Sequence, residues 1–99
     1  MNEFTKRRWY DEDPTLSFAV GLLEKADKSI QTECAEIIIQ KAHDFNIYIP
    51  ENRLEDSFNY ILKRWYDEDK VISDSFEYLK IMSFDLQKEI SLELIEKLG

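Results

Sequence analysis

Apolar residues recur along most of the chain at intervals of three and four, the spacing that places side chains on one face of an α-helix. Five such stretches follow one another, and charged residues fill the positions between the apolar ones. We therefore predict an all-α fold with five helices, at about residues 14–26, 28–45, 52–65, 70–82 and 84–98. The segment 47–49 alternates over only three residues before Pro50, which is too short for a sheet and predicts a connector.

A short polar residue stands at the start of each of the five predicted helices. Asp13 precedes Pro14, a combination typical of an N-cap and a first helical position. Asp27 and Ser83 are also common N-cap types. The segment 52–55 has the form of a capping box, a short polar residue followed three positions later by glutamate. Residues 1–10 carry less of the apolar pattern, and we expect a turn or a short helix there.

The sequence Arg-Trp-Tyr-Asp-Glu-Asp occurs twice, at residues 8–13 and 64–69, an offset of 56 positions (64 − 8). The same offset aligns residues 8–41 with residues 64–97 without a gap. Further identities are Ser17 and Ser73, Leu23 and Leu79, Gln31 and Gln87, Glu33 and Glu89, Ile39 and Ile95, and Lys41 and Lys97. Such self-similarity is typical of pseudo-symmetric units. We predict one domain, residues 1–99, in which two quasi-repeated antiparallel helical hairpins are joined by a connector and a central helix.

The first predicted helix carries a second apolar stripe that its repeat lacks. Phe18 and Leu22 stand where the repeat has Asp74 and Tyr78. The first helix is therefore either more central than its counterpart or exposes an apolar patch, and we expect the central position. An exposed stripe would instead suit an isologous dimer, in which the same surface is used by both subunits.

The formal net charge is −8, and both halves of the chain are acidic. A phosphate backbone or an acidic lipid surface would be repelled, so we predict no nucleic-acid partner and no membrane partner. A basic protein or a divalent cation would be compatible with this charge. The longest uncharged apolar run, residues 18–23, is far too short to cross a bilayer, and no secretory signal is visible. We expect a cytoplasmic protein.

The residue types that usually carry catalysis are scarce. Cys34 and His43 are the only cysteine and histidine, and a helix would hold them about 13 Å apart, too far for a nucleophile and its base. Cys34 also aligns with Ile90, which indicates a buried apolar position. The chain has no metal-type spacing of cysteine and histidine and no glycine-rich phosphate loop. We predict that the protein is not an enzyme and has no catalytic residues, metal site or cofactor.

The duplicated motif is the main candidate for a functional site, because Arg, Trp and Tyr dominate the binding energy of many interfaces. The alternative, which we favour, is structural. The two tryptophans would fill the corners between helices, the last aspartate of each motif would cap a helix, and the arginines would pair with carboxylates. The candidate partner-binding residues are Arg8, Trp9, Tyr10, Arg64, Trp65, Tyr66, Phe18 and Leu22.

We predict that the protein is an interaction or regulatory module that binds a protein partner or a second copy of itself. Two alternatives remain open. The acidic triplets at residues 11–13 and 67–69 could bind Ca²⁺ or Mg²⁺ through carboxylate oxygens, although they lack the spacing of an EF-hand loop. The acidic charge could also make the protein an inhibitor that occupies the nucleic-acid site of a basic partner.

Overall fold

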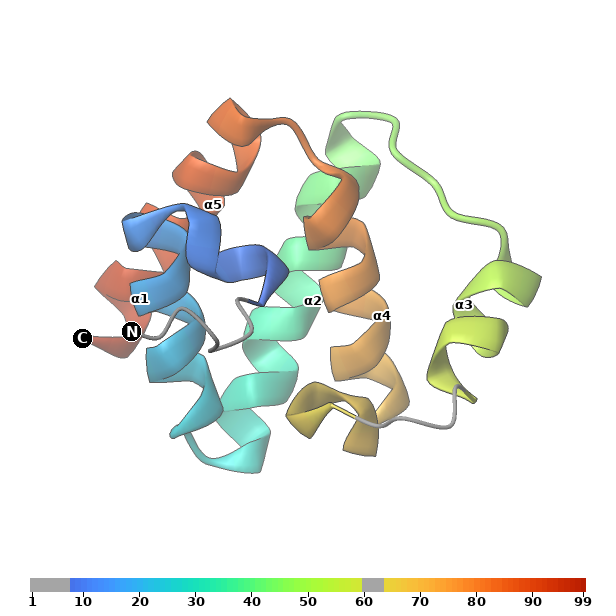
Figure 1. Cartoon of the computed structure of the whole chain (residues 1–99), viewed down its shortest axis with the longest axis horizontal. Helices are drawn as coiled ribbons and strands as arrows, with labels where there is room; N and C mark the ends of the chain where they lie inside the picture. The colour runs from blue at the N-terminus through green and yellow to red at the C-terminus, as the bar shows by residue number, and fades with distance from the viewer. Residues whose placement is uncertain (1–7, 60–63) are drawn as a thin grey trace.

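The chain folds into a small helical bundle, seen in a computed structural model that describes residues 8–59 and 64–99 (Figure 1). Over these residues the helices are α1 (Pro14–Glu24), α2 (Lys28–Asp44), α3 (Glu51–Phe58), α4 (Lys70–Ile81) and α5 (Phe84–Leu98). Two short 3₁₀ helices, η1 (Trp9–Glu12) and η2 (Trp65–Glu68), contain the twin motifs. The same residues contain no strand, so the prediction of an all-α fold with five helices is confirmed. None of the helices described is both long and apolar enough to cross a bilayer.

The starts of the helices follow the predicted capping residues in most cases. The side chain of Asp13 accepts a hydrogen bond from the backbone N–H of Leu16, and Pro14 is the first residue of α1. Ser83 accepts the equivalent bond from Leu86 at the start of α5. Asp27 occupies the N-cap position of α2, but its side chain makes no capping hydrogen bond. These contacts satisfy backbone donors that a helix start leaves without a partner.

The predicted third helix is the one that differs most from its prediction. It begins at Glu51, with Pro50 at the N-cap position and no side-chain capping bond. The predicted capping box at residues 52–55 is therefore wrong, because Asn52 already lies inside the first turn. The fixed φ of proline and an acidic residue in the first turn favour this earlier start. The helix ends at Phe58; residues 60–63 lie outside the described chain, and the predicted last residue, Trp65, belongs to η2.

The helices pair across the two halves of the sequence. α2 packs mainly on α4, α1 packs mainly on α5, and α3 lies against the side of α4 away from α2 (Figure 1). The helices of each expected hairpin, α1 with α2 and α4 with α5, contact each other far less. The arrangement as two hairpin units is therefore not confirmed, because the first helix of each half packs on the second helix of the other half.

The core lies where these four helices meet. Its largest side chains with almost no exposure come from all four helices, and they include Leu23, Ile38, Phe76, Leu79, Ile90 and Leu94. Cys34 is fully buried among them, as its alignment with Ile90 predicts. Burial raises the pKa of the Cys34 thiol above its ordinary value, so the thiol is kept protonated and unreactive.

The apolar stripe on α1 is on the surface. Phe18 is 58% exposed, and Leu22 is only partly buried. The expectation that the first helix is the more central one is therefore wrong. Its counterpart α4 is the central helix, because it lies between α2 and α3, and Tyr78, at the position of Leu22, is buried there (Figure 1).

Candidate partner-binding site between the twin motifs

In the first motif a single aspartate, Asp11, accepts hydrogen bonds from both sides of the turn. Arg8 donates from its Nε to Asp11 Oδ2 at 2.8 Å, and its backbone N–H donates to the same oxygen at 3.3 Å. The hydroxyl of Ser17, on the first turns of α1, donates to Asp11 Oδ1 at 2.8 Å. The hydrogen bond from Arg8 is the largest cause that holds the pKa of Asp11 below its ordinary value. Asp11 therefore ties the turn of the motif to the helix that follows it.

The second motif repeats each of these contacts in a more buried setting. Arg64 Nε donates to Asp67 Oδ2 at 2.7 Å, and Ser73 donates to Asp67 Oδ1 at 2.8 Å. Arg64 also reaches Glu77, with its Nη2 at 3.4 Å from the carboxylate. The side chain of Asp67 is fully buried, whereas that of Asp11 is 20% exposed. Burial acts to raise the pKa of Asp67, but the hydrogen bonds from Arg64 and Ser73 outweigh it, and the pKa lies below its ordinary value.

The remaining acidic residues of the motifs divide into caps and exposed side chains. Asp69 accepts hydrogen bonds from the backbone N–H groups of Val71 and Ile72, as Asp13 does from Leu16 in the first copy. The glutamates of the two motifs, Glu12 and Glu68, are exposed. The four aspartates of the acidic triplets, Asp11, Asp13, Asp67 and Asp69, thus already accept hydrogen bonds from other groups of the protein. No group of three or more His, Cys, Asp or Glu within residues 8–59 and 64–99 is arranged to hold a metal ion.

The aromatic residues of the motifs reach across to each other. The indole N–H of Trp9 donates to the Tyr66 hydroxyl at 3.2 Å, and that of Trp65 donates to the Tyr10 hydroxyl at 3.4 Å. The buried ring of Phe76 contacts all four rings, with centroid distances from 4.2 Å for Tyr66 to 6.5 Å for Tyr10. Each tryptophan therefore braces the opposite motif as well as its own corner.

Between the two motifs lies a cavity of about 310 Å³. Its described lining consists of six residues, namely Arg8, Trp9, Tyr10, Arg64, Trp65 and Tyr66. The structure thus brings together six of the eight candidate residues named from the sequence. Phe18 and Leu22 do not line this cavity.

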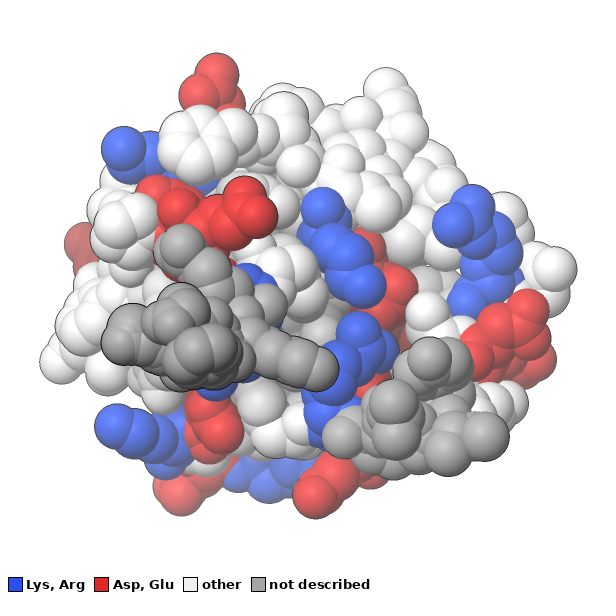
Figure 2. Space-filling view, viewed as in Figure 1, with Lys and Arg blue, Asp and Glu red and all other residues white. Residues whose placement is uncertain are grey.

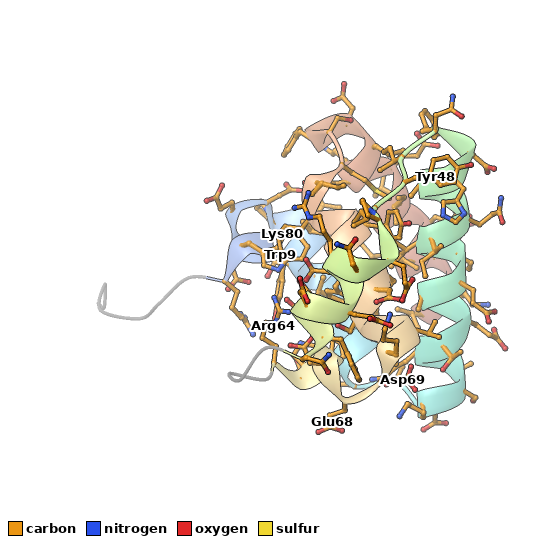
Figure 3. The ribbon with its side chains drawn as sticks, turned by 90° about the vertical axis from the view of Figure 1, so that its right-hand side faces the viewer. Trp9, Tyr48, Arg64, Glu68, Asp69 and Lys80 are labelled. Carbon is orange, nitrogen blue, oxygen red and sulfur yellow. The ribbon has the colours of Figure 1, made fainter. Side chains whose placement is uncertain are left out.

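The chemistry of the cavity follows from how its polar atoms are used. The guanidinium carbon of each arginine lies over the tyrosine ring of its own motif, at 4.9 Å for Arg8 and Tyr10 and 4.7 Å for Arg64 and Tyr66. The indole N–H groups and the arginine Nε atoms already donate within the chain. The cavity therefore offers aromatic carbon to an occupant, with two cations at its edge. Figure 3 places Trp9, Arg64 and Lys80 on the same side of the molecule.

Two ion pairs show the same reciprocity as the aromatic contacts. Lys97 Nζ lies 3.2 Å from Glu33, and Lys41 Nζ lies 3.7 Å from Glu89. In the alignment of the two halves Glu33 corresponds to Glu89, and Lys41 corresponds to Lys97. Both pairs join α2 to α5. Sequence reasoning missed them, although two oppositely charged identities at one offset were a usable signal.

The repeated glutamines also have equivalent partners. Gln31 Nε2 donates to the backbone carbonyl of Leu23 at 3.0 Å, and Gln87 Nε2 donates to that of Leu79 at 2.8 Å. Each bond satisfies a carbonyl near the C-terminal end of the preceding helix, where intrahelical partners run out. Together with the serines and the ion pairs, these bonds give every repeated polar residue outside the motif a structural role.

A separate aromatic cluster, away from the twin motifs, lies at the end of α2. The ring of His43 stacks on Tyr48, and its Nε2 lies 3.5 Å from the Tyr78 hydroxyl. The same hydroxyl accepts a hydrogen bond from the backbone N–H of Ile49 at 3.2 Å. These contacts fix the connector to α2 and α4. The sequence placed His43 near the end of its helix but did not predict its aromatic partners.

Comparisons of the chain with models of protein families, with curated proteins and with solved structures find no match.

Proposed function

We propose that the protein is a non-enzymatic interaction module that takes an aromatic side chain of a partner protein into the cavity between its twin motifs. The observation that supports this most is the lining of that cavity, two arginines, two tryptophans and two tyrosines around about 310 Å³. These three residue types supply most of the hot spots at protein interfaces. The volume is at the lower end of the range of ligand cavities, about 300–1,000 Å³.

We expect an aromatic occupant because aromatic side chains form most of the cavity lining. Aromatic rings attract one another edge to face at centroid distances of about 4.5–7 Å, the geometry that Phe76 already has with Trp9 and Trp65. A charged occupant would gain little, because the Nε atoms of Arg8 and Arg64 are already bound to carboxylates. The occupant is therefore held by ring contacts and by exclusion of water.

We further infer that the two halves are copies that associate as the subunits of an isologous dimer do. In such a dimer residue i contacts j on the partner, and j contacts i in return. The contacts of Trp9 with Tyr66 and of Trp65 with Tyr10 have this form. On this view the protein is a fused dimer of helical pairs, and the cavity is its shared interface.

The other candidate functions have less support. Self-association through Phe18 and Leu22 rests on the exposure of Phe18 alone. A response to divalent cations would need carboxylates that the structure already uses as caps and as partners of Arg8 and Arg64. An acidic inhibitor would need a continuous negative surface, and Figure 2 shows acidic and basic side chains mixed on the face it draws. Absence of catalysis and a cytoplasmic location remain parts of the proposal.

A peptide library displayed on phage, selected against the full chain, tests this function. Both tryptophans of the protein line the cavity, so the intrinsic fluorescence reports directly on its occupancy. The expected result is a family of peptides with an aromatic anchor that change the tryptophan fluorescence on binding. Replacing the anchor by alanine should weaken binding by at least about tenfold, which corresponds to about 1.4 kcal/mol.

Matched variants separate binding from folding. Trp9→Ala should weaken the selected peptides, and its melting temperature shows whether the fold survives. Arg8→Ala changes the rim of the cavity at an exposed side chain, so it tests binding where Trp9→Ala is too unstable. Phe18→Ser removes an exposed aromatic residue away from the cavity and should bind normally. Peptides that bind all these variants equally would refute the proposed site.

A further inference from the structure

A second hollow, of about 570 Å³, lies between α2 and α5. None of the twin-motif residues lines it, so it is separate from the cavity described above. Its described lining is Glu33, Glu36, Ile37, Gln40, Lys41, Asp44 and Glu93. We call this hollow the α2–α5 groove.

The α2–α5 groove has an excess of negative charge. Its described lining contains four acidic residues and one lysine. That lysine, Lys41, is already shared between Glu89 at 3.7 Å and Glu93 at 3.6 Å. Glu36 is exposed and makes no ion pair within the described chain. Glu33 is paired with Lys97 at 3.2 Å, so within the described chain the groove carboxylates without an ion-pair partner are Glu36 and Asp44.

The groove also offers an apolar contact. Among the described lining residues Ile37 is apolar, and its side chain is partly buried. The groove residues of α2 run from Glu33 to Asp44, about 16 Å along the helix axis at 1.5 Å per residue. An apolar side chain flanked by carboxylates over about three helical turns matches the surface of a basic amphipathic helix.

We propose that the α2–α5 groove binds a basic amphipathic helix of a partner protein. Lysine or arginine side chains of that helix pair with Glu36 and Asp44, while its apolar face covers Ile37. This is the helix-in-groove mode of recognition, read through anchors three and four residues apart. The net charge of −8 attracts such a segment before contact and speeds its association.

The test uses the full chain and a fluorescent synthetic peptide with lysine on one helical face and leucine on the other. Binding is followed by fluorescence anisotropy at low and at high salt. The expected result is saturable binding that weakens as the salt concentration rises, because the charged contacts are screened. A peptide of the same composition in scrambled order, which cannot form an amphipathic helix, should bind far less. Equal binding of both peptides would overturn the proposal.

Charge-reversal variants locate the binding surface. Glu36→Lys should weaken the amphipathic peptide by about tenfold, and Ile37→Ala should weaken it without a change in net charge. Glu55→Lys, on α3, changes the net charge by the same amount as Glu36→Lys but lies outside the groove, so it should have less than about a twofold effect. If Glu36→Lys and Glu55→Lys weaken binding equally, net charge alone explains the attraction and the groove is not the site.

Discussion

The indole N–H of Trp9 donates a hydrogen bond to the hydroxyl of Tyr66 at 3.2 Å, which joins the first copy of the motif to the second. The duplicated sequence is therefore a cross-brace between the halves of the chain as well as a turn within each half. Because the same rings wall the cavity, the residues that hold the halves together are also those that a partner would touch.

The cross-brace can be measured by removing the indole donor while an aromatic ring is kept. Trp9→Phe keeps a smaller ring but loses the bond to Tyr66, so the free energy of unfolding should fall by at least about 1 kcal/mol, the usual net value of one hydrogen bond. Trp9→Ala and Trp65→Ala also remove the ring and should each lower it by about 3–5 kcal/mol. Urea unfolding followed by circular dichroism gives these values. A Trp9→Ala protein as stable as wild type would show that the ring contributes nothing to the fold.

The two aspartates that close the motifs provide a matched pair with different burial. Asp67→Ala removes a buried carboxylate and leaves Arg64 without its main partner, so we expect a loss of about 3 kcal/mol. Asp11→Ala makes the same change where Arg8 is exposed, and the loss should be about 1 kcal/mol. Thermal and urea unfolding of the two variants compare them directly. Equal losses would contradict the difference in burial.

Asp67 also sets part of the acid sensitivity. Its pKa is lower in the folded protein than its ordinary value, so the folded state holds the charged form more strongly than the unfolded chain does. This contributes stability above about pH 4 that is lost as the pH falls through the lowered pKa. The free energy of unfolding should therefore drop in this acidic range, and less steeply in Asp67→Asn. An identical pH dependence in both proteins would argue against this role of Asp67.

Two phenylalanines should respond in opposite ways to truncation. Phe76→Ala empties the centre of the aromatic cluster and should cost about 3–5 kcal/mol. Phe18→Ala removes a side chain that is 58% exposed and should change stability by less than about 0.5 kcal/mol. Differential scanning calorimetry of both variants makes the comparison. A large loss in Phe18→Ala would mean that this residue is covered in solution, for example in a dimer that light scattering would detect.

The helices were predictable because each buries one face, and the residues on a buried face are apolar at regular intervals of three and four along the sequence. Four of the five helices begin at the predicted residue and end within two residues of the predicted end. The start of α3 was missed because two start signals compete over three residues, and Pro50 prevails over Asn52.

The pairing of the helices could not be predicted in the same way. Periodicity tells which face of α1 is buried, but not that α5 rather than α2 covers it. For the same reason the exposure of Phe18 could not be predicted, because it depends on which neighbouring helices cover α1. The duplicated motif did identify six residues of the candidate site, since residues placed equivalently in two copies meet where the copies associate.

Nuclear magnetic resonance of the two indole N–H groups tests the central claim most directly. Trp9 and Trp65 give the only two such signals, and both residues line the cavity. During titration with a selected aromatic-anchored peptide, both signals should shift together and saturate at the same peptide concentration. Binding of the peptide with both indole signals unmoved would contradict the claim that the twin motifs form one binding site.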